Sequence, residues 1–165
     1  FRSADADQII EMLVDIIAKN GSMLLNILQR PDGSIDAEAV YILEEMGAWF
    51  AAAGEAVYGT RPWKTSGEGD TFVTIDGFTE NKTNWQPDDV RYTCKGNTVY
   101  AFLMGGARKG VAVLRSFDEG ERIAGVRLLG VGEVPFVHEL GTLCVQLPQT
   151  KPNAYTNVLA IELKQ

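Results

Sequence analysis

The fold is decided by a short apolar stretch near the start of the chain, NGSMLLNI, which spans residues 20–27. An Asn-Gly pair opens the stretch, and the turn residues RPDG follow it at positions 30–33. A short apolar run between turn signals, flanked by helical patterns, predicts a strand that is buried on both faces. Such strands belong to parallel sheets that are covered by helices. Since one strand of this kind is not stable by itself, we expect its parallel neighbours to come from residues outside this chain.

The residues on either side of this stretch predict two helices. Before it, apolar residues recur at helical spacing, and Lys19 with the Asn20-Gly21 pair ends the helix. After it, Asp36 caps a second helix that Gly54 ends. The positions that we assign to the buried helix faces are Ile9, Ile10, Leu13, Val14 and Ile17, then Val40, Leu43, Met46, Gly47 and Phe50. A helix, a turn and a buried strand form half of a repeating α/β unit.

Beyond Trp63 the pattern changes to that of an all-β structure. Residues 64–86 are rich in Gly, Thr, Asn, Asp and Ser, which predicts a connector with a short strand at 72–75. Alternating residues 90–94 and 98–103 flank a tight Lys-Gly-Asn turn and predict a hairpin. Further strands are expected at 110–115, 123–129, 136–140, 142–147 and 157–163. Short strands separated by Gly and Pro turns favour an antiparallel β-sandwich, so we divide the chain into residues 1–63 and 64–165.

The bulk composition excludes several classes of function. A net charge of -7 and a pI near 4.7 argue against nucleic acid or an anionic membrane as a partner. No window of the sequence approaches the roughly 20 apolar residues that a membrane-spanning helix needs. Cys94 and Cys144 are too few for a disulfide framework or a zinc site, and we interpret both as buried free thiols, although pairing between them stays open. We therefore expect no metal and no cofactor; homo-oligomer formation stays open.

Three residues are candidates for a catalytic or binding role. His138 is the only histidine and lies in an alternating strand, which favours a packed or surface side chain over a catalytic one. Glu55 has apolar neighbours in the sequence, and we favour a role in anchoring the segment that leaves the second helix over acid-base chemistry. Asn26 ends the predicted buried strand. Since active sites of parallel barrels gather at the carboxyl ends of the strands, Asn26 either lines a substrate pocket or bonds the following loop.

Four motifs carry a family resemblance, and they occur in the family's order over nearly the whole chain. They are LVDIIAKNGSMLLNI at 13–27 with RPDG at 30–33, GEAVYGTRPW at 54–63, RYTCKGNTVYA at 91–101 and LLG at 128–130. This set resembles the α-L-fucosidases of glycoside hydrolase family 29. Leu28 and Gln29 depart from the family pattern, which has Gly-Pro at these positions.

The resemblance implies a fold and an activity. Residues 1–63 would be the last helix-strand-helix part of a (β/α)8-like catalytic barrel, and residues 64–165 would be the C-terminal β-sandwich with its connector. Family members remove terminal α-L-fucose with retention, using an aspartate nucleophile and, in many members, a glutamate acid/base. Both carboxylates are expected upstream of this chain, so no catalytic residue is assigned here and the chain alone is expected to be inactive. A fucosylated glycan or fucoside would be the substrate, and the remainder of the barrel would be a partner. A secreted, periplasmic or lysosomal location is compatible with the family.

Two rival interpretations stay open. The sandwich is a carbohydrate-binding module that uses exposed aromatic residues, with Tyr92, Tyr100 and Trp85 as candidates. Alternatively, the chain is a structural fragment that completes a barrel with a separate chain.

Overall fold

The computed structural model describes residues 5–73, 83–149 and 155–164, and it has two helices followed by two antiparallel sheets. The helical elements are α1 (Ala6–Ala18), α2 (Ala37–Ala53) and the short 3-10 helix η1 (Gly54–Ala56). The strands are β1 (Arg61–Glu68), β2 (Val90–Lys95), β3 (Thr98–Leu103), β4 (Val111–Leu114), β5 (Ile123–Leu128), β6 (Gly132–Glu133), β7 (Phe136–Glu139), β8 (Thr142–Gln146) and β9 (Asn157–Leu163). No helix among these described residues is both long enough and apolar enough to cross a membrane.

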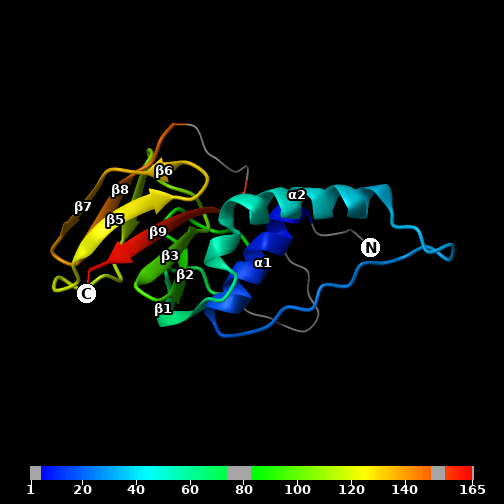
Figure 1. The fold of residues 1–165 in the computed structure, drawn as a ribbon, viewed down its shortest axis with the longest axis horizontal. Helices are drawn as coiled ribbons and strands as arrows, with labels where there is room; N and C mark the ends of the chain where they lie inside the picture. Colours follow the sequence, from blue (N-terminus) through cyan, green and yellow to red (C-terminus); the bar gives the residue numbers. More distant parts are fainter. Residues whose placement is uncertain (1–4, 74–82, 150–154, 165) are drawn as a thin grey trace.

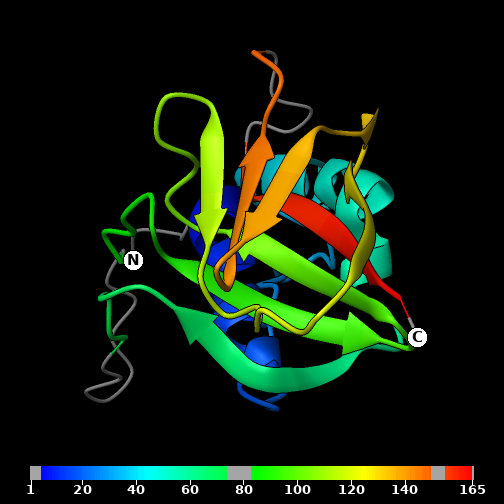
Figure 2. The same cartoon turned by 90° about the vertical axis from the view of Figure 1, so that its left-hand side faces the viewer.

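The elements form three layers (Figure 1). The six-stranded sheet, in the order β1-β2-β3-β9-β5-β6, lies in the middle. A three-stranded sheet, β4-β8-β7, covers one face, and the helices cover the other, as the end-on view of Figure 2 shows. The two sheets together are the antiparallel sandwich that the alternating pattern predicts, and the helices add a layer behind it.

The central strands β3 and β9 are buried on both faces, and alternate side chains serve different cores. Ala101 and its partner Leu159 point into the core between the sheets. Phe102 and its partner Val158 point into the core under the helices. All four side chains are fully buried. The sheet is therefore held by apolar packing from both sides.

A buried ion pair fastens helix α1 to the sheet. Asp5 caps the helix by accepting a hydrogen bond from the backbone N–H of Gln8 at 2.9 Å. Near the other end of α1, Asp15 accepts a 2.6 Å hydrogen bond from Nε of Arg91 on β2, and both side chains are more than nine-tenths buried. Asn20 then takes a left-handed backbone conformation, with a φ of 65°, and ends the helix as the Asn-Gly pair predicts.

The structure corrects the sequence-based prediction at several places. On α2, Val40 and Gly47 are exposed, and Met46, Trp49 and Ala53 form the buried face instead. Residues 21–28 form no strand and are not buried on both faces, because none of the described strands lies beside them. Strand β1 was not predicted; it runs across the predicted domain boundary at 63/64, so that division stays a prediction. Residues 72 and 73 have no regular structure, and the rest of the strand predicted at 72–75 lies outside the described residues.

Candidate functional site

The segment at residues 21–28, which contains the substrate-binding candidate Asn26, has several strongly exposed apolar side chains. It leaves the end of α1 and extends away from the sheets before the chain returns to α2 (Figure 1). Leu24 and Leu28 are 87% and 80% exposed, and Leu25 and Ile27 are partly exposed. Single exposed apolar residues are ordinary, but a contiguous run of them marks a contact surface.

Asn26 lies in the middle of this segment and is exposed. Its amide can donate and accept hydrogen bonds, which suits recognition of hydroxyl groups. The position is therefore available for binding.

A compact turn closes the loop that follows Asn26. Asp32 accepts hydrogen bonds from the backbone N–H and the hydroxyl of Ser34, at 2.9 and 2.7 Å. These bonds, the hydroxyl's first, lower the pKa of Asp32. Nη2 of Arg30 donates to Oδ1 of Asp36 at 2.8 Å, so Asp36 begins α2 without bonding a helix N–H through its side chain. The chain that follows the segment is thus held by local contacts.

The other carboxylate and histidine candidates are placed as structural residues. Glu55 accepts a hydrogen bond from Arg127 at 3.1 Å, which ties η1 to β5 and agrees with the anchoring role. His138 is half-buried on β7 opposite Leu143, and its buried Nε2 atom has no hydrogen-bond partner among the described residues. Among the described residues, no group of three or more His, Cys, Asp or Glu side chains gathers as a metal site.

The two cysteines are free and half-buried rather than fully buried. Burial raises the pKa of the Cys94 thiol, whose sulfur lies 3.6 Å from the carbonyl oxygen of Pro62. The Cys94 thiol is therefore not activated, because a reactive cysteine needs a lowered pKa.

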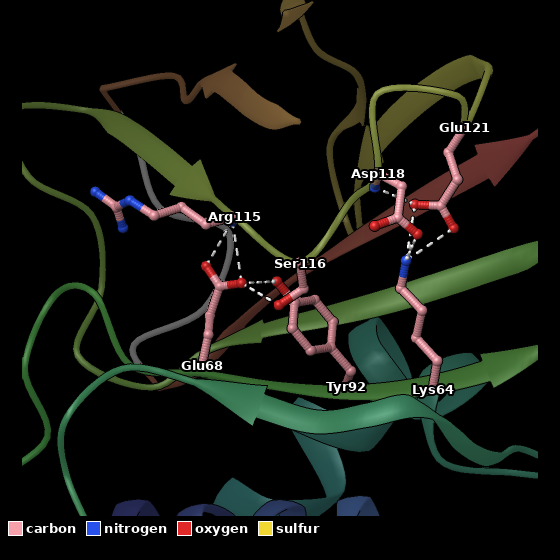
Figure 3. A network of polar contacts seen from close by, with 7 residues as sticks. All are labelled: Lys64, Glu68, Tyr92, Arg115, Ser116, Asp118 and Glu121. Atoms are coloured by element: carbon pink, nitrogen blue, oxygen red, sulfur yellow. Dashed lines mark hydrogen bonds and ion pairs between the residues drawn. The ribbon is translucent and has the colours of Figure 1, made fainter. Parts of the chain in front are cut away.

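Figure 3 shows a polar network that the sequence did not reveal. Glu68 at the end of β1 accepts hydrogen bonds from the Tyr92 hydroxyl at 3.0 Å, from the Ser116 hydroxyl, and from the backbone N–H of Arg115 at 2.9 Å. Burial, followed by the charge of Glu68, raises the pKa of Tyr92 well above its usual value. The network joins the six-stranded sheet to the loop after β4, which makes it a structural fastening.

Lys64 makes a second contact between β1 and the same loop. Its Nζ atom lies 2.8 Å from Asp118 and 3.0 Å from Glu121. Partial burial lowers the pKa of Lys64, but its hydrogen bonds to the two carboxylates outweigh burial and raise the pKa overall.

The network went unpredicted because residues 61–68 contain Pro, Ser and Gly, which are typical of an irregular segment rather than a strand.

The aromatic candidates of the binding-module interpretation are not exposed together. Tyr92 is buried between the two sheets and Tyr100 is buried under the helices, with exposed fractions of 0% and 5%. Trp85 is half-buried, with its ring 4.8 Å from the guanidinium carbon of Arg91. The structure therefore contradicts a glycan platform built from these three rings.

Comparisons with known proteins identify similar sequences over both parts of the chain. The family model described as alpha-L-fucosidase matches residues 2–55, and the model described as alpha-L-fucosidase C-terminal domain matches residues 81–164. The tissue alpha-L-fucosidase of Rattus norvegicus is 32% identical over 162 residues, which are 97% of this chain and 31% of the relative. The human tissue enzyme is 29% identical over the same shares. The chain thus spans about a third of the length of the curated relatives that it matches.

Solved structures share the fold. The alpha-L-fucosidase isoenzyme 1 from Paenibacillus thiaminolyticus is 27% identical, covers 98% of this chain with 35% of its own, and superposes with a TM-score of 0.76. The Thermotoga maritima alpha-fucosidase in complex with fucose is 25% identical, with 97% and 35% coverage and a TM-score of 0.72. These likenesses confirm the arrangement of a barrel end followed by a β-sandwich.

Proposed function

Because this chain belongs to the α-L-fucosidase family, we propose that it forms the C-terminal portion of a retaining enzyme that removes terminal α-L-fucose from glycans. In this proposal, the helices and the segment between them complete a (β/α)8-like catalytic barrel. The sandwich packs behind the helices and holds them in place through contacts such as the Asp15–Arg91 ion pair.

The exposed segment at residues 21–28 is the observation that carries the proposal. Both helices that flank it bury apolar faces against the sheet, whereas Leu24 and Leu28 have no apolar cover. A strand in a parallel barrel is covered on both faces and hydrogen-bonded on both edges. The segment therefore has the composition of such a strand, and the preceding portion of the enzyme would supply its neighbours.

The catalytic carboxylates belong to that preceding portion in this proposal. Retention requires two carboxyl groups roughly 5–5.5 Å apart on either side of the sugar. The carboxylates described above serve structural contacts: Glu55 pairs with Arg127, and Glu68 joins the two sheets. We assign neither catalytic role to a residue of this chain.

Asn26 is the one substrate-binding residue that we propose. It would lie at the carboxyl edge of the completed barrel, where its amide can bond a sugar hydroxyl. In the assembled enzyme, Asn26→Ala is expected to raise KM more than it lowers kcat, because the interaction forms with the bound substrate.

Hydrolysis of an aryl α-L-fucoside tests the proposal. The purified 165-residue chain is expected to show no turnover, and activity is expected when it is mixed with the portion of a family member that precedes the matched region. Leu24→Asp should abolish the restored activity, while Leu140→Asp, on another strongly exposed leucine, should leave it unchanged. Turnover by the purified chain alone would contradict the proposal and would call for a carboxylate pair within the chain.

A further inference from the structure

Three residues that line one pocket each have a buried polar atom without a hydrogen-bond partner. Within the described part of the chain these atoms are Nε1 of Trp85, Oγ1 of Thr156 and Oδ1 of Asn157. Nearly all buried polar atoms in folded proteins are paired, so each exception requires an explanation. His138 has the other unpaired atom, and it does not line this pocket.

The pocket lies where four parts of the chain meet. Helix α1 supplies Asp7 and Glu11, the end of β3 and its following loop supply residues 103–106, residues 83–85 form a third wall, and residues 155–157 at the start of β9 form the fourth. Its volume is about 240 Å³. Pockets for drug-sized ligands hold roughly 300–1,000 Å³, so this one suits a smaller compound, such as a single ring.

The wall formed by the start of β9 is held in place by hydrogen bonds to α2. Nε1 of Trp49 donates to the carbonyl oxygen of Thr156 at 2.8 Å, and the Tyr155 hydroxyl donates to Glu45 at 2.5 Å. Nδ2 of Asn157 donates to the carbonyl oxygen of Tyr155 at 3.0 Å, which leaves Oδ1 as the unpaired end of the amide. The unpaired groups of Thr156 and Asn157 therefore sit on a backbone that is held by hydrogen bonds.

The unpaired groups define the chemistry of an occupant. The indole N–H only donates, the amide oxygen only accepts, and the threonine hydroxyl does both. The carboxylates of Asp7 and Glu11 repel an anion, and an indole N–H, which can only donate a hydrogen bond, does not ligate a metal ion. A compound with several hydroxyl groups matches all three, because each hydroxyl can donate and accept.

We propose that this pocket binds a small neutral polyhydroxyl compound, with a single-ring sugar as the fitting class. The three atoms are shielded from solvent in the structure, so binding includes small rotations of the side chains that bring these atoms to face the ligand. The assignment stands on the pocket alone and does not depend on the fucosidase function.

Nuclear magnetic resonance of the indole groups tests the site directly. The chain has three tryptophans, so a ¹⁵N-labelled sample gives three indole signals, and Trp85→Phe identifies one of them. Titration with D-glucose, D-galactose or L-fucose is expected to shift the Trp85 signal saturably for at least one of these sugars. D-galacturonate should bind more weakly because of the two carboxylates. The Trp63 signal, from the sandwich core, serves as the internal reference.

A matched pair of substitutions separates binding from stability. Thr156→Val keeps the shape of the side chain and removes the unpaired hydroxyl, so affinity should fall about tenfold while the melting temperature stays equal or rises. Thr98→Val, at the other end of β3, should change neither. If none of the sugars shifts the Trp85 signal at concentrations that fill a millimolar site, the proposal is wrong. An equal shift in Thr156→Val, or equally tight binding of galacturonate, would overturn it as well.

Discussion

Two apolar stretches of this protein have similar composition and opposite environments. Strand β9 (Asn157–Leu163) is hydrogen-bonded to β3 on one edge and to β5 on the other, and it has a core on each face. Residues 21–28 have no neighbouring strand among the described residues, and apart from Met23, which packs against the core under the helices, their apolar side chains are exposed. The comparison teaches that an apolar run indicates a need for burial. Whether the run is buried depends on whether neighbouring strands and a packed layer are present to cover it.

The largest expected difference in the free energy of unfolding comes from replacing a leucine by alanine in each of the two stretches. Leu159→Ala, in β9, removes a fully buried side chain and should lower the free energy of unfolding by about 2–5 kcal/mol. Leu24→Ala removes a side chain that is 87% exposed and should change it by about 0.5 kcal/mol or less. Urea denaturation measures both. Equal effects would mean that the two stretches are not in different environments.

A smaller effect is expected from the polar network that fastens the sandwich. Glu68→Gln keeps the size of the side chain but weakens its bonds to Tyr92 and to Arg115, so the free energy of unfolding should fall by about 1–3 kcal/mol. Glu139→Gln, on the exposed side of β7, is the matched control and should be neutral. A neutral Glu68→Gln variant would show that the hydrogen bonds of Glu68 add nothing to the stability of the sandwich.

The same network predicts a loss of stability in alkaline solution. Burial and Glu68 raise the pKa of Tyr92 in the folded state above its ordinary value of 10.0. The folded state therefore holds the phenol proton more tightly, and its contribution to stability is complete below pH 10 and is lost as the pH rises further. Thermal melts from pH 8 to 11 should show a falling melting temperature, with a shallower fall in Tyr92→Phe. An unchanged slope in that variant would assign the loss to other groups.

The smallest effect belongs to the turn beside the exposed segment. Arg30 and Asp36 are both more than half exposed, so solvent screens their ion pair. Arg30→Ala should lower the free energy of unfolding by about 0–1 kcal/mol, and 0.5 M salt should remove most of the difference. A loss larger than that of Glu68→Gln would mean that this turn is part of the stable core.

The sequence predicted most strands because their alternation is intrinsic to the chain. Strand β9 has the predicted bounds, 157–163, and β2 and β3 form the predicted hairpin. Strand β1 escaped prediction because its pairing with β2 shifts register between Pro62 and Gly67, where the residues have no strand pattern. The prediction of a buried strand at residues 20–27 rested on the composition of these residues. Composition does not show which strands, if any, lie beside them.

The candidate sites were predictable to different degrees. Asn26 was found because it sits next to a recognisable apolar run. The pocket at Trp85 was not, because Trp85, Thr156 and Glu11 are distant in the sequence and share no motif spacing. Only the folding of β9 beside β3, with α1 across them, brings these residues together.

Amide hydrogen exchange of residues 21–28 tests the central claim most directly. In the 165-residue chain alone, the amides of residues 22–28 should exchange at rates close to those of an unfolded peptide, while the amides of β9 and that of Gly21, which donates to the carbonyl oxygen of Ile16, stay protected. When the portion of a family member that precedes the matched region is added, residues 22–28 should become protected and β9 should change little. Protection of residues 22–28 equal to that of β9 in the chain alone would contradict the claim that this segment is completed by another part of an α-L-fucosidase.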